Sequence, residues 1–137
     1  MTEIRARGIV DGEAAGPMLV TPALSFLGDI DIRSGCIVGD LPPQVKGRTL
    51  KGHVLVMPFT RGSAGSWRFL YQLSKLNTHP LAIVTDDLPD PSVVQGAILA
   101  RIPVACSPQI GTADFAVPGR RLCVNVRDGV ATLSVES

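Results

Sequence analysis

The chain has 137 residues, of which 45% are hydrophobic and only 4% aromatic, with 13 basic and 12 acidic side chains. This length suits a single domain (residues 1–137) with an aliphatic core, and the composition excludes a disordered chain. The net charge of +1 and the few aromatic residues argue against nucleic-acid binding, because such surfaces need clustered cations or stacking rings.

The N-terminus lacks the hydrophobic stretch of a signal peptide, and no apolar run approaches the length of a membrane span. We therefore expect a cytoplasmic protein that contacts no membrane. The three cysteines, Cys36, Cys106 and Cys123, are widely spaced and form no CxxC pair. This spacing favours neither a disulfide framework nor a zinc site, and we interpret all three as structural.

The first third of the chain predicts strands followed by a long irregular segment. Residues 3–20 contain short apolar runs broken by glycines, which is typical of an opening strand with a hairpin or bend. Residues 21–52 are dense in Gly, Pro and Asp and have no sustained period, although residues 36–38 suit a short strand. Loops of this length inside a compact domain are often functional or covered by a partner.

The next stretch, HVLVMPFTRGSAGSWRFLYQLSKLN (residues 53–77), predicts a buried strand, a turn of small residues and an amphipathic helix that begins at Ser66. Its apolar positions define the inner face of the helix, namely Phe69, Leu70, Leu73 and Leu76. We expect unpaired backbone N–H groups at the start of this helix, where they favour a negatively charged ligand or intermediate. Arg61 adds a positive charge just before the turn.

A second strand is expected over residues 81–84, and a third over residues 102–106. Asp90 followed by Pro91 is typical of a helix start, with a side-chain acceptor at the cap and then a residue fixed near helical φ. This helix should run to about residue 100. Its expected inner stripe is Val94, Ala97 and Ile98.

Residues 107–120 predict a loop with helical character over residues 112–116. Beyond it, Asp128–Gly129 separates two alternating runs, RLCVNV and VATLSV, which is a strong hairpin signal. The central β-α-β-α-β order implies parallel strands, and the two ends imply antiparallel hairpins. We therefore predict an α/β domain with a mixed sheet, a central β-α-β-α-β unit and flanking hairpins.

The turn TRGSAGS is the strongest candidate for chemistry, although it matches neither a Walker A motif, nor GxGxxG, nor GxSxG. In one interpretation it is a polar turn with Ser66 as helix N-cap. In the other, a serine hydroxyl acts as base or nucleophile, activated by Arg61 and backbone N–H groups. His53 and His79 are poor general-base candidates, and no Ser/His/Asp arrangement can be assembled. The acidic residues at 86–90 favour helix capping over a metal site.

Three stretches resemble, in order and spacing, the small subunit or swivel domain of the aconitase X family. They are GPMLVTPALSFLGDIDIRSGCIV, GRTLKGHVLVMPFTRGSAGSWRFLYQL and HPLAIVTDDLPDPSVVQGAILARIPV. The resemblance covers residues 8–135 and implies a swivelling β/β/α domain. It also implies one half of a heterodimeric hydro-lyase, in which a large subunit carries an iron–sulfur cluster and this chain binds no cofactor or metal.

The resemblance implies roles for the turn. In the wider superfamily this domain brings a Gly-Ser turn into a site on the larger subunit, where the serine removes a proton from carbon. Ser63 is therefore the first candidate for catalytic base. Ser66 is the second, because this turn is one residue shorter than the usual GRGSSSGS. Arg61, Gly62 and Gly65 are implied in substrate binding, and SFLGD (residues 25–29) is expected at the subunit junction or the active-site rim.

Two hydroxy-acid substrates are implied by the resemblance: cis-3-hydroxy-L-proline, which bacterial members convert to a pyrroline-2-carboxylate, and mevalonate 5-phosphate in archaea. Ten Arg against three Lys is unlike hyperthermophilic chains, which favours the bacterial reaction and keeps phosphomevalonate as the alternative. The alternative from a different functional class is a non-enzymatic module that binds an anion or a partner. This hypothesis predicts that the isolated chain binds a ligand. A stand-alone hydrolase is least favoured, because no general base accompanies the serine.

Overall fold

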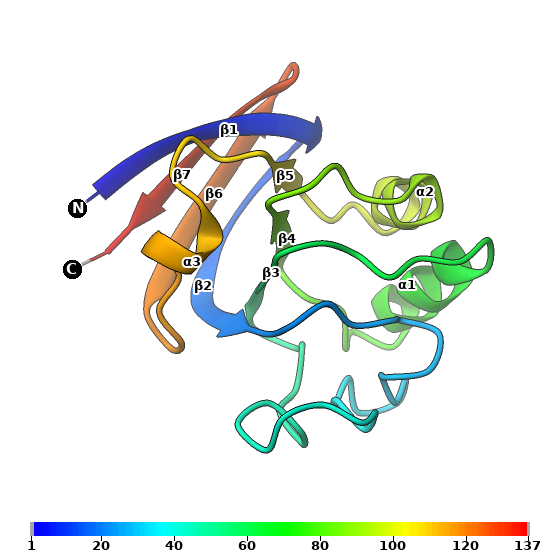
Figure 1. Ribbon diagram of the computed structural model, residues 1–137. Coiled ribbons are helices and arrows are strands. Elements are labelled where there is room, and N and C mark those ends of the chain that lie inside the picture. Colours follow the sequence, from blue (N-terminus) through cyan, green and yellow to red (C-terminus); the bar gives the residue numbers. More distant parts are fainter. Residues whose placement is uncertain (1, 137) are drawn as a thin grey trace.

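The computed structural model describes residues 2–136, which form a mixed α/β fold (Figure 1). The strands are β1 (Thr2–Val10), β2 (Gly12–Val20), β3 (Val54–Met57), β4 (Ala82–Thr85), β5 (Val104–Cys106), β6 (Arg121–Arg127) and β7 (Val130–Val135). The helices are α1 (Ser66–Lys75), α2 (Pro91–Ala100) and α3 (Thr112–Phe115). The predicted central β-α-β-α-β unit is confirmed as β3-α1-β4-α2-β5.

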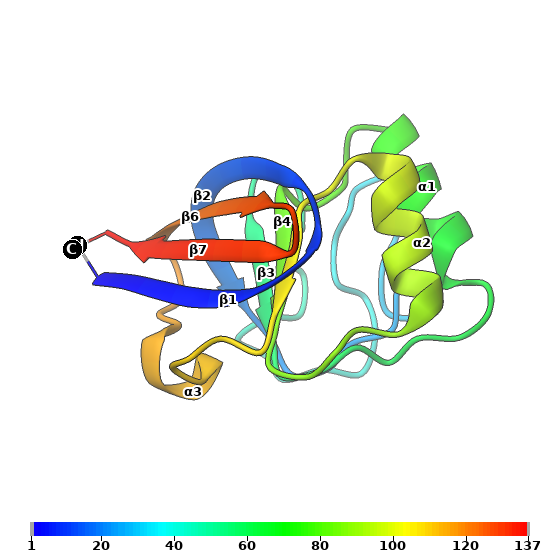
Figure 2. The ribbon, with the colours of Figure 1, turned by 90° about the horizontal axis from the view of Figure 1, so that it is seen from above.

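The strands close into a barrel in the order β1-β5-β4-β3-β2-β6-β7. Strands β2, β3, β4 and β5 are parallel neighbours, whereas the other pairings are antiparallel. Figures 1 and 2 show α1 and α2 side by side on one side of this barrel, away from α3. The predicted mixed sheet is therefore correct, and its parallel part lies next to the helix pair.

The N-terminal strands form a bend and not a hairpin. β1 pairs with β5 and β7, whereas β2 pairs with β3 and β6. The chain turns at Asp11–Gly12, with Gly12 at φ 150°, and the two strands then separate around the barrel. The flanking hairpin predicted at this end is thus wrong, because pairing with distant strands closes the sheet.

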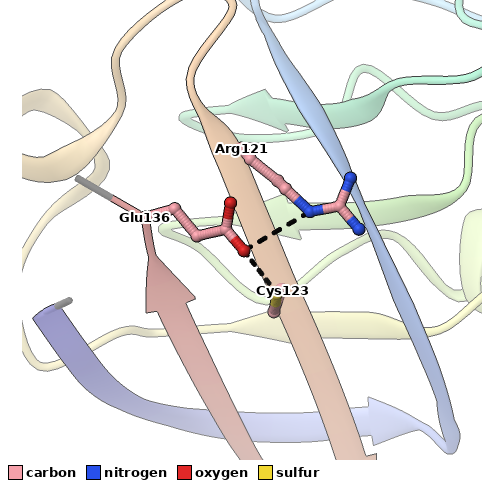
Figure 3. Close-up of polar contacts among 3 residues, drawn as sticks. All are labelled: Arg121, Cys123 and Glu136. Carbon is pink, nitrogen blue, oxygen red and sulfur yellow. Dashed lines mark hydrogen bonds and ion pairs between the residues drawn. The ribbon is translucent and has the colours of Figure 1, made fainter.

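The C-terminal hairpin of β6 and β7 is confirmed. Asp128 and Gly129 at its tip have φ values of 52° and 82°, which is the left-handed conformation that a two-residue hairpin turn requires. Arg121 and Glu136 lie at the other end of the hairpin, where their side chains form an exposed ion pair of 3.5 Å beside the thiol of Cys123 (Figure 3). The ends of the described chain also meet here, since Thr2 pairs with Val135.

Two apolar clusters share the parallel strands. One cluster includes Val54, Val56 and Val84 together with residues of β6 and β7. The other includes Leu55 and Ile83 together with residues of α1, α2 and the long loop. Every residue of β3, β4 and β5 is buried, because successive side chains alternate between the two clusters. This explains why their sequences are continuous apolar runs without alternation.

Both long helices pack one face on the sheet, but their inner faces differ in part from the prediction. In α1 the buried residues are Ser66, Leu70 and Leu73, and Leu76 lies beyond the last turn with half of its surface exposed. In α2 the buried residues are Val93, Gly96 and Ala97, whereas Ile98 is exposed. The inner stripe of α2 is therefore rotated by one residue, because Gly96 allows the close approach of α1.

The irregular segment over residues 21–53 is packed by its own apolar side chains. Leu24, Phe26, Ile37 and Leu50 are at most 1% exposed and join the cluster beneath the helices. The short strand expected at residues 36–38 is absent, since this region forms only two isolated bridges. Among residues 2–136, no helix is long and apolar enough to cross a membrane.

Candidate functional site

The Gly–Ser turn lies where the parallel strands end. It follows β3, and the loop from Asp86 to Asp90 follows the neighbouring strand β4. A surface pocket of about 430 Å³ opens here between the turn and the start of α2. It is lined by Gly62, Ser63, Ala64, Asp90, Pro91, Ser92 and Gln95.

The two candidate serines occupy different environments. Ser63 is exposed and lines the pocket, whereas Ser66 is fully buried at the start of α1. The amide of Ser63 donates to the hydroxyl of Ser66 at 3.0 Å, and the amide of Ser66 donates to the carbonyl of Ser63 at 3.1 Å. The interpretation of Ser66 as N-cap is wrong: Gly65 occupies the cap without a side-chain bond, and Ser66 is the first helical residue.

The start of α1 offers fewer free N–H groups than expected. The amides of Ser66 and Arg68 donate to carbonyls within the turn, and the amide of Trp67 donates to Ser92 Oγ at 3.0 Å. Within the part of the chain that the structure describes, the amides of Ala64 and Gly65 have no acceptor. The free donors therefore belong to the turn itself, directly after Ser63.

Contacts from the start of α2 hold the turn in place. Asp90 is the N-cap residue of α2, but its carboxylate makes no capping bond to its own helix. The carboxylate instead accepts hydrogen bonds from the hydroxyl of Thr60 and from the amide of Gly62. The expectation that Asp90 caps its own helix through its side chain is thus wrong. Sequence reasoning also missed Thr60 and Ser92, because their partners lie 28–30 residues away along the chain.

The two basic residues near the turn, Arg61 and Arg68, are exposed and do not line the pocket. Arg61 is exposed, and its guanidinium forms no ion pair with any of residues 2–136. The ion pair found among these residues is Arg121–Glu136. Arg68 is also exposed, and its guanidinium lies 5.9 Å from the centroid of the Trp67 ring. None of the described residues that line the pocket is basic.

The segment SFLGD forms a closed loop beside the turn. Its first and last residues are joined, because the amide of Ser25 donates to the carboxylate of Asp29 at 2.7 Å. Leu27 at its tip is 44% exposed and lies 3.5 Å from the position that a Cβ at Gly65 would take. The expected place of this segment at the rim of the site therefore agrees with its geometry.

The remaining titratable groups lie apart from the turn or support the fold. Asp86 accepts from the amide and the hydroxyl of Thr112 and so anchors the start of α3. His79 Nδ1 is buried without a partner among the described residues, and burial lowers the pKa of His79 despite the opposing carbonyl of Leu73. His53 Nδ1 contacts the carbonyl of Lys51 at 3.0 Å.

The cysteines of this chain do not fit an iron–sulfur cluster. Cys106 is buried in β5, Cys123 lies in β6, and Cys36 lies in the long loop. No group of three or more His, Cys, Asp or Glu side chains within residues 2–136 is arranged to hold a metal ion. The groups that this chain itself presents at the turn are the hydroxyls of Ser63 and Ser66, the guanidinium of Arg61 and backbone N–H groups.

Fold and site together define a class: an α/β domain that presents an exposed Gly–Ser turn from the carboxyl ends of its parallel strands. Residues 3–132 match the family described as aconitase X swivel domain. The chain belongs to this family, which confirms the resemblance noted in the sequence.

Known relatives cover nearly all of the chain. It is 33% identical to the phosphomevalonate dehydratase small subunit of Methanosarcina mazei, over 96% of this chain and 90% of that protein. The protein of the same name from Pyrococcus horikoshii is 31% identical, over 98% and 97%. A chain of the crystal structure of Thermococcus kodakaraensis aconitase X, in its holo form, superposes with a TM-score of 0.88 at 28% identity and covers both chains completely.

Proposed function

We propose that this chain is the small subunit of a dehydratase that acts on mevalonate 5-phosphate, and that it supplies Ser63 as the catalytic base. The observation that carries the proposal is the exposure of Ser63 on a turn whose other serine is buried. The family and the names of the relatives support the reaction class and favour the phosphorylated substrate over hydroxyproline.

The chemistry required of this chain is the removal of one proton. In the dehydration of a hydroxy acid, a base takes a proton from carbon while the hydroxyl on the adjacent carbon leaves. A serine performs this task only if its oxyanion is stabilised by aimed donors and shielded from water. The free amides of Ala64 and Gly65 and the cation of Arg61 are the donors that this chain offers near Ser63. Arg61 is equally placed to bind a substrate carboxylate.

A second polypeptide is needed to exclude water from the turn. Three large apolar side chains in the segments around it are exposed: Leu27 at 44%, Phe59 at 46% and Leu88 at 60%. Exposed apolar surface beside a candidate site is typical of regions that a partner covers. We infer that a large subunit covers this rim and completes the site, and we assign the iron–sulfur cluster to that subunit and none of its chemistry to this chain.

The absence of basic residues from the lining of the pocket supports cis-3-hydroxy-L-proline as a second candidate substrate. A phosphate group is usually held by Arg or Lys, and this chain brings only Arg61 and Arg68 near the turn. Phosphomevalonate therefore requires that the large subunit bind most of the phosphate, whereas hydroxyproline requires no such site.

Reconstitution tests the proposal. The chain is co-expressed with its large subunit, and the purified complex is assayed with mevalonate 5-phosphate and with cis-3-hydroxy-L-proline. We expect dehydration of the phosphorylated substrate by the complex and none by either subunit alone. If the complex dehydrates only hydroxyproline, the proposed substrate is wrong, but the proposed role of this chain is retained. Tight binding of either compound by the isolated chain, without activity of the complex, would favour a non-enzymatic binding module.

A further inference from the structure

The carboxylate of Asp90 joins two segments that are distant in sequence. Oδ2 accepts a hydrogen bond from the hydroxyl of Thr60 and a second, of 2.8 Å, from the amide of Gly62. The amide of Asp90 donates in return to the hydroxyl of Thr60 at 3.0 Å. Three hydrogen bonds therefore connect the loop after β3 to the start of α2, on both sides of Arg61.

Glycine at position 62 is required by this close approach. A Cβ there would lie 2.6 Å from both Cβ and Oδ2 of Asp90, which no real contact allows. The φ angle of Gly62 is not positive, so space and not backbone conformation explains the glycine. The residue before Ser63 is thus pressed directly against the carboxylate.

Ser92 holds the other side of the same turn. Its hydroxyl donates to the carbonyl of Ala64 at 3.1 Å and accepts from the amide of Trp67 at 3.0 Å. Ser63 lies between these two anchor points and is itself exposed. The turn is therefore fixed by its neighbours on each side, while its central side chain stays free to meet a substrate.

We propose that Asp90 is a positioning residue for the catalytic serine: it sets the place of the Gly62–Ser63 backbone relative to α2, with Ser92 as a second anchor. This inference rests on the proposed role of Ser63. A carboxylate is a strong acceptor for an N–H group, and this carboxylate is directed to the turn and not to its own helix, since α2 receives no side-chain cap.

Two substitutions separate the acceptor from the charge. Asp90→Ala removes the acceptor, whereas Asp90→Asn keeps an oxygen that can accept from both Thr60 and Gly62. In the reconstituted complex we expect Asp90→Ala to lower kcat by about 100-fold, the size of effect that a misplacement near 1 Å causes. KM should change less, and Asp90→Asn should restore most of kcat. Asp87→Ala, an exposed carboxylate of the same loop, is the matched control and should keep full activity.

A double-substitution cycle tests whether Asp90 acts through Ser63. If it does, adding Asp90→Ala to a Ser63→Ala complex should lower the residual rate by less than two-fold, because the positioned group is already missing. An equal loss in both backgrounds would overturn the proposal and point to a separate role. Full activity of Asp90→Ala in a complex that Ser63→Ala inactivates would also overturn it.

Amide hydrogen exchange of the isolated full chain gives a readout that does not depend on activity. Asp90→Ala should raise the exchange rate of the Gly62 amide at least ten-fold and leave amides of the β6–β7 hairpin unchanged. Unchanged exchange at Gly62 would show that the carboxylate does not hold the turn. If Ser63→Ala proves fully active, the proposed function fails, and the exchange experiment still decides whether Asp90 fixes the backbone.

Discussion

The amide of Ser63 donates a hydrogen bond of 3.0 Å to the hydroxyl of Ser66, so the exposed serine of the turn is held by the buried serine that begins α1. Ser66 is 0% exposed, so in this arrangement its hydroxyl does not face the solvent side of the turn where a substrate would bind. This difference in exposure is the reason why we propose Ser63, and not Ser66, as the base. Ser66 then supports the backbone of the turn.

The two serines should therefore respond differently to substitution. Ser63→Ala in the reconstituted complex should lower kcat by about 10²–10⁴-fold, the usual contribution of a general base, with little effect on folding. Steady-state kinetics of the complex and thermal unfolding of the chain measure the two effects.

Ser66→Ala should instead lower the free energy of unfolding by about 1 kcal/mol, because the Ser63 amide loses its acceptor. Its effect on kcat should be smaller than that of Ser63→Ala. If both variants kept full activity, the serine-base mechanism would be excluded. If only Ser66→Ala were inactive while folded, the assignment of the base would move to Ser66.

Gly96→Ala should destabilise the chain by overpacking the contact between α1 and α2. A Cβ at this position would lie 2.8 Å from Cα of Trp67 and 2.9 Å from Cβ of Leu70. We expect a loss of about 1–3 kcal/mol, measured by urea unfolding. Gly28→Ala is the matched control, since nothing lies within 4 Å of its Cβ position. Equal stability of the two variants would mean that the helices are free to move apart.

Protonation of His79 should weaken the fold. Burial lowers the pKa of His79 below its ordinary value of 6.5, so the folded state favours the neutral ring. The unfolded chain then binds more protons between the two pKa values, and stability should fall as the pH decreases from about 6.5 toward the folded pKa. Urea unfolding of the wild type and of His79→Gln across this range should show a smaller slope in the variant. Parallel curves would contradict the prediction.

The ion pair between Arg121 and Glu136 should add little to stability. Both side chains are well exposed, at 52% and 41%, and their charged atoms are 3.5 Å apart (Figure 3). Exposed pairs of this kind are worth about 0.2–1 kcal/mol and are screened by salt. A double-mutant cycle with Arg121→Ala and Glu136→Ala should give a coupling below about 1 kcal/mol. A clearly larger coupling would contradict this expectation.

Local patterns predicted the parts of the fold that local chemistry determines. The apolar runs located the buried parallel strands, small residues located the turn, and Asp128–Gly129 located the C-terminal hairpin. The closed barrel was not predictable in this way, because β1 pairs with β5 and β7 far along the chain. A local rule also assigned Asp90 to its own helix, whereas its carboxylate binds the loop near Thr60. The serine turn itself needed the family resemblance, since its motif alone matches no common catalytic pattern.

Closure of the sheet restricts how a second subunit can attach. Each of the seven strands has a neighbour on both sides, so no described strand is an edge strand along its whole length that an incoming chain could extend. We therefore expect a partner to bind mainly through side chains and loop backbone at the ends and flanks of the barrel. A junction of this kind would form or separate without breaking the strand ladder.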